Sequence, residues 1–276
     1  MSELFPPISP DRPIRVAMVV EYDGAEYYGW QMQKTGVPTV QGELTRAISA
    51  VANHPVDLIV AGRTDAGVHA CRQIIHFDTD AKRKEFGWTV GTNTHLPRNI
   101  SVQWAKEMDH YFHARFSARE RRYRYVIYNN QIPPGISRKN LTWEKRALDA
   151  QAMHRAAQSL VGTHDFSSFR AANCQAASPV KTLKQIDVSR HGQLVVIDVR
   201  ADGFLYHMVR NIAGVLIEIG CGAEAENWCA HILSLQDRSL GGVTARPEGL
   251  YFVDAIYDDD VALPETQLGP NFLSWL

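Results

Sequence analysis

The sequence predicts an α+β fold in two halves. Three observations lead to this prediction: runs of strand length recur along the chain, each half repeats apolar residues at helical spacing, and a segment rich in Pro, Gly, Arg and Lys lies between the halves. A chain of 276 residues is long enough for two modest domains. We expect an N-terminal domain over residues 1–130, a connection over 131–148 and a C-terminal domain over 149–276.

The first half opens with a Pro-rich polar segment, Met1–Pro13, which is typical of a loose arm. Pro38-Thr39 starts a helix with one apolar face, and a shorter helix is predicted over 86–93. The apolar face of the first helix comprises Val40, Leu44, Ala47, Ile48 and Val51. The predicted strands are Ile14–Glu21, Leu58–Val60, Arg72–Phe77, Ser101–Lys106 and Arg122–Tyr128.

The second half begins at Asp149, which we expect to cap a helix by accepting hydrogen bonds from its first amides. The turn His191-Gly192 joins two strands into a hairpin. The apolar face of the Asp149 helix comprises Met153, Ala156, Ala157, Leu160 and Val161. The remaining predicted elements are strands at Leu183–Arg190, Gln193–Ala201 and Leu250–Ile256 and helices at Leu205–Ile219 and Ala225–Leu235.

The composition is that of an ordinary globular protein, with 45% hydrophobic and 21% charged residues. No apolar run approaches the roughly 18 residues of a membrane helix, and the N-terminus lacks the features of a signal peptide. We therefore expect a cytoplasmic protein with no membrane partner. The four cysteines show no Cys-x-x-Cys spacing, which argues against a zinc site. The apolar segment Pro270–Leu276 either contacts a second subunit or folds back onto its own domain.

The net charge of −1 argues mildly against nonspecific nucleic-acid binding, but the charge is uneven. Between His113 and Arg124 the chain carries a basic segment in which Glu120 is the single acid. Its arginines are Arg115, Arg119, Arg121, Arg122 and Arg124. A local basic strip of this kind suits a phosphate backbone.

The stretch Ala61–Ala70 combines two glycines with an arginine, an aspartate and a histidine between two predicted strands. Loops between strands often carry function because a rigid scaffold aims them. Arg63 and Asp65 point the same way in an extended segment, so the cation would favour the ionised carboxylate that a nucleophile needs. From spacing alone, an ordinary turn in which Asp65 bonds its own backbone explains the pattern as well.

Four further motifs extend this stretch into a pattern of five that covers the chain from about Ile14 to its C-terminus. In chain order the five are Tyr22-Asp23-Gly24 with Tyr28-Gly29-Trp30-Gln31, the Asp65 loop, Phe112–Ala118, Arg122-Tyr123-Arg124-Tyr125 and Phe204–Asn211. Together they resemble the TruA-type tRNA pseudouridine synthases. The resemblance implies two ferredoxin-like (RRM-like) halves whose sheets meet at a central active-site cleft.

The resemblance also implies site residues. Asp65 would be the catalytic nucleophile, Arg210 would pair with it, and Tyr123 would stack on the target base. At helical spacing Tyr206, Arg210 and Gly214 fall opposite the apolar stripe of their predicted helix, where a solvated surface arginine is the ordinary alternative. Tyr123 and Tyr125 share one face of a predicted strand, and we expect Tyr125 to be core. The expected substrate-binding residues are Tyr123, Arg63, Gln31, His69, His113 and Arg115.

The implied reaction is isomerisation of uridine to pseudouridine in tRNA, within the anticodon stem-loop at positions 38 to 40. It needs no metal, no nucleotide and no other cofactor, and the resemblance implies a homodimer. Asp65 could attack C1′, attack C6 of the base or remove a ribose proton. Two other classes remain: a non-catalytic RNA-binding module, for which a carboxylate facing phosphates is no advantage, and a metal-dependent nuclease, for which clustered acidic ligands are lacking.

Overall fold

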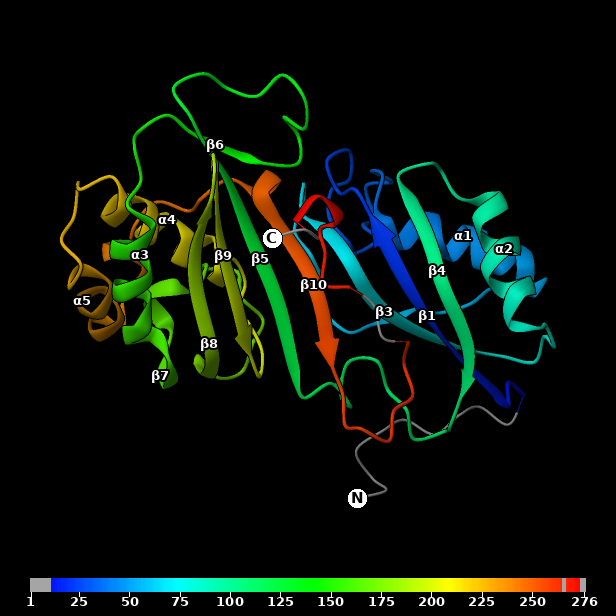
Figure 1. Ribbon diagram of the computed structural model, residues 1–276. Coiled ribbons are helices and arrows are strands. Elements are labelled where there is room, and N and C mark those ends of the chain that lie inside the picture. The colour runs from blue at the N-terminus through cyan, green and yellow to red at the C-terminus, as the bar shows by residue number, and fades with distance from the viewer. Residues whose placement is uncertain (1–10, 265–266, 274–276) are drawn as a thin grey trace. The chain divides into compact units, whose positions relative to one another are not determined.

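The computed structural model describes residues 11–264 and 267–273 (Figure 1). Residues 1–10 of the expected arm and 274–276 of the apolar C-terminal segment lie outside the described residues. The chain divides into two compact units, of which the first runs up to Arg119 and resumes at Phe252 and the second runs from Glu120 to Tyr251. No helix in the described part combines the length and apolar character needed to cross a membrane.

This division differs from the expected domain boundaries. The strand β5 (Glu120–Asn129), expected in the N-terminal domain, opens the second unit. Most of the final strand, β10 (Leu250–Ile256), expected in the C-terminal domain, belongs to the first unit. The apolar runs locate both strands correctly, but they carry no information about the sheet that each strand joins, because strand pairing links residues far apart in the sequence.

The first unit is a sheet with two helices against it (Figure 1). Its strand order is β4-β1-β3-β10, with β1 antiparallel to both neighbours and β2 paired with β3. The elements are β1 (Ile14–Tyr22), α1 (Val40–Ala52), β2 (Ile59–Val60), β3 (His69–Thr79), α2 (Glu85–His95) and β4 (Ile100–Met108). Every predicted element of this unit is present.

Local sequence explains how these helices form and pack. Thr39 caps α1, since its hydroxyl accepts a hydrogen bond from the Gly42 amide at 3.3 Å. The predicted apolar face of α1 is buried except at Val51, which is half-buried, and Ala52 completes it. Trp88 of α2 packs edge-on against Phe77 of β3 with ring centroids 5.3 Å apart, so α2 closes the core over the sheet.

The C-terminal segment returns to the first unit. Pro270 is buried and Leu273 is 5% exposed. A Cβ built on Gly269 would lie 2.6 Å from the sulfur of Cys71, so the chain passes directly over β3 here. The described part of this segment therefore folds back onto the same chain, but onto the first unit and not onto the C-terminal domain expected over residues 149–276.

The second unit is an antiparallel sheet in the order β5-β9-β8-β7, and β6 pairs in parallel with β5. Figure 1 shows α3, α4 and α5 gathered beside β8 and β9. The elements are β6 (Thr142–Glu144), α3 (Ala150–Ala157), β7 (Gly162–Asp165), β8 (Val180–His191), β9 (Leu194–Ala201), α4 (Met208–Gly220) and α5 (Trp228–Leu235). The strands β6 and β7 are short and were not predicted.

Caps and turns of the second unit follow the sequence closely. The Asp149 carboxylate accepts hydrogen bonds from the amides of Gln151 and Ala152 at 2.9 and 3.0 Å, which confirms the predicted cap. The β8–β9 hairpin turns at His191-Gly192 as expected.

Two details of the second unit differ from the prediction. Val161 is 39% exposed and does not belong to the buried face. Helix α4 begins at Met208 and not at Leu205, because His207 adopts a left-handed φ of 61° that apolar spacing does not reveal.

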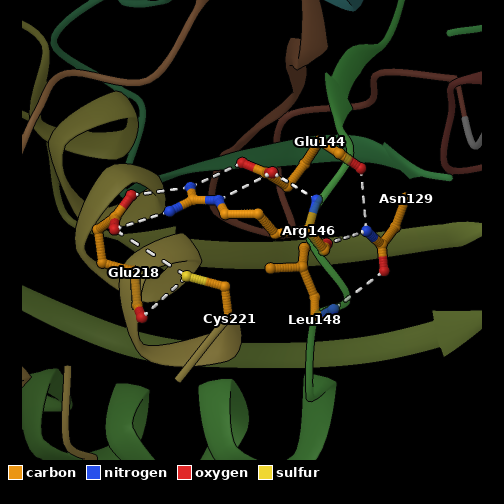
Figure 2. Close-up of polar contacts among 6 residues, drawn as sticks. All are labelled: Asn129, Glu144, Arg146, Leu148, Glu218 and Cys221. Atoms are coloured by element: carbon orange, nitrogen blue, oxygen red, sulfur yellow. Dashed lines mark hydrogen bonds and ion pairs between the residues drawn. The ribbon is translucent and has the colours of Figure 1, made fainter. Parts of the chain in front are cut away.

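The segment expected as an inter-domain connection is an anchored part of the second unit (Figure 2). Arg146 forms paired hydrogen bonds with Glu144, at 3.0 and 2.8 Å, and with Glu218 of α4, both at 2.9 Å. Asn129 of β5 accepts a hydrogen bond from the Leu148 amide at 3.2 Å. The hydrogen bonds that Arg146 donates to both carboxylates raise its pKa, so this cation holds the end of the connection on α4.

Candidate active site

The Asp65 loop lies between β2 and β3 in the first unit, and neighbouring backbone holds it. The Thr64 carbonyl accepts a hydrogen bond from the Trp30 amide at 3.0 Å, and the Gly67 amide donates to Tyr27 at 3.2 Å. Gly29 has a φ of 88°, and a Cβ there would lie 2.9 Å from the Thr64 carbonyl oxygen, so only glycine lets the two loops meet this closely. The loop does contain a turn, since the Val68 amide donates to the Asp65 carbonyl at 3.1 Å.

Buried polar side chains support the same loop from inside the unit. The hydroxyls of Tyr22 and Thr64 lie 2.7 Å apart, and Gln73 donates to the Gly62 carbonyl at 2.7 Å. Burial raises the pKa of Tyr22 to about 12, so this phenol stays neutral at physiological pH. Thr64 therefore points inward, whereas Arg63 is exposed and Asp65 is half-buried.

His69, an expected substrate-binding residue, is 1% exposed. Its Nδ1 lies 3.1 Å from the Gly24 amide nitrogen and 3.0 Å from the Asp23 carboxylate. Nδ1 can form only one of these two hydrogen bonds at a time. Without a proton it accepts from the Gly24 amide, and with a proton it donates to the Asp23 carboxylate. In both tautomers His69 ties the turn after β1 to the start of β3.

Gln31, the second substrate-binding candidate in this unit, is exposed. Its amide donates to the Gln41 side chain on α1 at 2.9 Å. Gln41 also accepts from the Met32 amide at 2.9 Å, so the loop after Trp30 is fastened to the first turn of α1. The chain on either side of Trp30 presents Tyr28 and Met32, which are 58% and 56% exposed, beside the residues that hold the Asp65 loop.

His113 is 2% exposed and organises the loop that follows it. Its Nδ1 accepts hydrogen bonds from the amides of Arg115 and Phe116 at 3.2 and 3.1 Å, and its ring stacks on Phe116 at 4.4 Å. Burial and the nearby Arg15 guanidinium lower the pKa of His113 to about 4, so the ring is neutral and can accept. Arg115 is exposed, with its guanidinium carbon 5.4 Å from the centre of the Phe116 ring.

The remaining arginines of the basic segment contact carboxylates and backbone. Arg119 pairs with Asp258 in the first unit, at 2.6 Å. Arg122 and Arg124 share one face of β5, as the period of two predicted, and both pair with Asp198 of β9, at 2.7 and 2.8 Å. Burial acts to raise the pKa of Asp198, but hydrogen bonds from the two arginines outweigh it and the pKa lies below its ordinary value. The basic strip is thus partly neutralised by acids distant in sequence.

Arg210 lies in the first turn of α4, in the second unit, and is half-buried. Its Nε donates to the Ala245 carbonyl at 2.8 Å. Asn211, its neighbour, is 2% exposed and donates to the Phe169 carbonyl at 2.7 Å. Arg210 is therefore oriented by the backbone of a second segment and is not an arginine surrounded by solvent.

Tyr123 and Tyr125 of β5 both face the interior. Tyr123 is 8% exposed and meets the Phe204 ring edge-on with centroids 5.0 Å apart. Tyr125 is fully buried, with its hydroxyl 2.7 Å from that of Thr142 and 2.8 Å from the Arg246 carbonyl, which confirms the core position expected for it. Burial raises the pKa of Tyr125.

The expected site residues thus belong to both units. The first unit contains Asp65, Arg63, Gln31, His69, His113 and Arg115, and the second contains Arg210 and Tyr123. Sequence reasoning did not identify Tyr22, Thr64 and Gln73 as supports of the Asp65 loop. A polar residue at an otherwise apolar strand position, such as Gln73 next to Ile74-Ile75, was the signal available for this. In the described part of the chain no cluster of three or more His, Cys, Asp or Glu side chains is placed to hold a metal ion.

Comparisons with known proteins match the parts of the chain that contain most of these residues. A family model described as tRNA pseudouridine synthase matches residues 18–117 and 156–258, which include every expected site residue except Tyr123. A tRNA pseudouridine synthase A from Pseudomonas aeruginosa is 52% identical over 280 residues, covering 100% of this chain and 98% of that protein. Proteins of the same name from Shewanella woodyi and Aliivibrio fischeri are 52% and 51% identical over 260 residues, covering 94% of this chain and 99% of each. The chain belongs to the tRNA pseudouridine synthase family.

Proposed function

We propose that this enzyme isomerises uridine to pseudouridine in tRNA. The C1′–N1 bond breaks and a C1′–C5 bond forms, while C5 loses a proton and N1 gains one. Oxidation state and composition are unchanged, so the reaction requires no cofactor. The names of the relatives support the substrate and the reaction. The structural observation that carries the proposal is the half-buried Asp65, held in a loop that backbone and buried side chains fix from several directions.

Asp65 is the proposed nucleophile. A reacting carboxylate gains rate from being held in place before the substrate arrives. Thr64 is fixed at both its carbonyl and its hydroxyl, and Gly67 is fixed through its amide. The residues on both sides of Asp65 are therefore restrained, while Asp65 itself retains access to solvent. This arrangement serves a reaction at C1′, at C6 or at a ribose proton equally well.

Arg210 and Tyr123 complete the proposed site. Arg210 would orient Asp65 through a charge-assisted pair, and the fixed position of its Nε favours a defined direction for the guanidinium group. Tyr123 is 8% exposed, more than His69 or His113, and it would stack on the flipped uracil through this exposed part of the ring that packs against Phe204. This proposal requires the two units to bring Asp65 and Arg210 together, as two ferredoxin-like halves with sheets meeting at a cleft would do.

The RNA contacts divide into direct and indirect ones. We assign Arg63, Gln31 and Arg115 to direct contact, since all three are exposed. Arg63 would fill the space left by the flipped nucleotide and hold its phosphate. His69 and His113 are buried, so they act on RNA only through the loops that they hold.

From the family resemblance we also propose a homodimer and a target at positions 38 to 40 of the anticodon stem-loop. A second copy would supply surface that one chain of 31.0 kDa lacks for so large a substrate. Sedimentation equilibrium with and without tRNA tests the homodimer. A species of one chain that retains full activity would exclude it.

Tritium release from tRNA carrying uridine labelled at C5 tests the reaction. The isomerisation releases tritium and leaves the RNA at full length. A nuclease would shorten the RNA, and a binding module would leave both label and length unchanged. Only the first result agrees with the proposal, and sequencing the product for modified sites would then test the assignment to positions 38 to 40.

A further inference from the structure

A backbone segment of the second unit, residues 241–246, crosses the first half of α4 at close range. We call it the strap. Gly214 faces it, and a Cβ built on Gly214 would lie 1.8 Å from the Val243 carbonyl oxygen. Val243 is 78% exposed, so the strap turns its backbone toward the helix and this side chain toward solvent. Any side chain at position 214 would push the strap off α4.

Polar side chains fasten the strap in this position. Thr244 donates to the side-chain oxygen of Asn211 at 2.7 Å, and Arg238 donates to the Thr244 hydroxyl at 2.9 Å. Asn211 is 2% exposed and is itself held by the Phe169 carbonyl. At the Arg246 end of the strap, the Tyr125 hydroxyl donates to the Arg246 carbonyl at 2.8 Å. The strap is thus held at Thr244 by the buried Asn211 and at Arg246 by the buried Tyr125.

The strap and Arg210 are joined by a reciprocal pair of hydrogen bonds. The Ala245 amide donates to the Arg210 carbonyl at 3.1 Å, and Nε of Arg210 donates to the Ala245 carbonyl at 2.8 Å. Because a guanidinium group is planar, fixing Nε sets the plane and the direction of Nη1 and Nη2. Those two nitrogens form the edge that binds a carboxylate in a bidentate manner.

We propose that the strap positions Arg210 for its carboxylate partner, and that Gly214 is the residue that makes this possible. The inference rests on the proposed function, in which that partner is Asp65. Gly214 touches neither substrate nor Asp65 in this scheme. It acts by admitting the Val243 carbonyl, which brings the Ala245 carbonyl within reach of Arg210. The strap is accordingly a positioning element and not part of the RNA-binding surface.

The test is the full-length Gly214→Ala variant, with single-turnover tritium release measured at saturating enzyme and tRNA affinity measured separately. A displacement of about 1 Å at a positioning group can cost on the order of 100-fold in rate, so we expect a loss of roughly that size with the dissociation constant changed less than about threefold. A bound rate within about twofold of the wild-type rate would overturn the proposal.

Gly220→Ala is the matched control. It places the same methyl group in the same helix, where it would meet the Met153 sulfur at 2.6 Å and not the strap. We expect this variant to lose stability while keeping a normal bound rate. An equal loss of rate in Gly220→Ala would mean that distortion of α4, and not the strap, explains the effect.

A second readout separates positioning from general disorder. In an Arg210→Ala background, Gly214→Ala should cause no further loss of rate, because the strap acts through Arg210. Additive losses would overturn the proposal. A normal bound rate in Arg210→Ala alone would refute the proposed catalytic role of Arg210. A slow Arg210→Ala together with a normal Gly214→Ala would refute only the positioning role of the strap. Should Gly214→Ala not fold, Thr244→Val removes the hydrogen bonds of Thr244 without adding bulk, and a rate equal to that of the wild type would then refute the proposal.

Discussion

Removing one hydroxyl beneath the Asp65 loop tests whether the loop must be held to work. In Tyr22→Phe the Thr64 hydroxyl loses the partner that lies 2.7 Å away. Both residues are buried, at 3% and 7% exposure, so water does not readily replace the lost hydroxyl. The lost hydrogen bond together with an unsatisfied hydroxyl costs about 1–3 kcal/mol in the free energy of unfolding.

The same change should slow chemistry. If only about 1.4 kcal/mol of the cost appears as displacement of Asp65 in the transition state, the single-turnover rate falls roughly tenfold. The assay is tritium release from bound tRNA, alongside urea unfolding to measure stability. Tyr27→Phe is the matched control, since it removes a hydroxyl that bonds Asn99 at 2.8 Å and leaves the Tyr27 carbonyl that holds Gly67.

The Tyr22→Phe, Thr64→Val double variant gives a second measurement. It removes both hydroxyls, so neither is left without the other, and its loss of stability should be smaller than the sum of the losses of the two single variants. The reasoning is refuted if Tyr22→Phe destabilises the protein yet leaves the bound rate equal to that of Tyr27→Phe. That result would mean that the loop keeps its geometry without the buried support.

Two further predictions concern pH and salt. Burial lowers the pKa of His76 to about 3 and that of His113 to about 4, whereas both rings have a pKa near 6.5 in the unfolded chain. The unfolded state therefore binds more protons in this range, and the free energy of unfolding should fall as pH decreases from about 6.5 toward 3. Urea unfolding at several pH values measures this slope, and a flat profile over that range would contradict it. Arg115→Ala should reduce the slope of log affinity for tRNA against log salt concentration by about one unit. Arg119→Ala should change this slope less, because Asp258 pairs with Arg119. Equal changes in the two variants would mean that Arg119 leaves Asp258 to bind phosphate.

Local signals predicted the elements well because their causes are local. Thr39 and Asp149 cap helices through amides two or three residues away, and the His191-Gly192 hairpin depends on adjacent residues. The division into units was not predictable in this way. The final strand is found at Leu250–Ile256 as expected, but most of it belongs to the first unit, where it pairs with β3. The ion pair between Arg72 of β3 and Asp254 of β10 joins residues some 180 positions apart, and no local signal reveals a pairing over that separation.

The candidate site shows the same limit. The motifs contained Tyr22 and Asp65, but they did not show that the Tyr22 and Thr64 hydroxyls meet or that Gln73 of β3 supports the Asp65 loop. His113 belonged to an expected RNA-contacting motif, yet its side chain is buried and organises that loop by accepting from the Arg115 amide. A motif identifies residues that act together, whereas burial decides which of them can touch a ligand.

Asp65→Asn tests the central claim most directly. The substitution preserves size and removes the negative charge and nucleophilicity of the carboxylate, so the fold and tRNA affinity should stay close to wild type while pseudouridine formation is abolished. Asp57→Asn, which changes an exposed carboxylate just before β2, is the matched control and should be fully active. Pseudouridine formation by Asp65→Asn at even about a tenth of the wild-type single-turnover rate, about 1.4 kcal/mol in activation free energy, would contradict the role of Asp65 as the nucleophile.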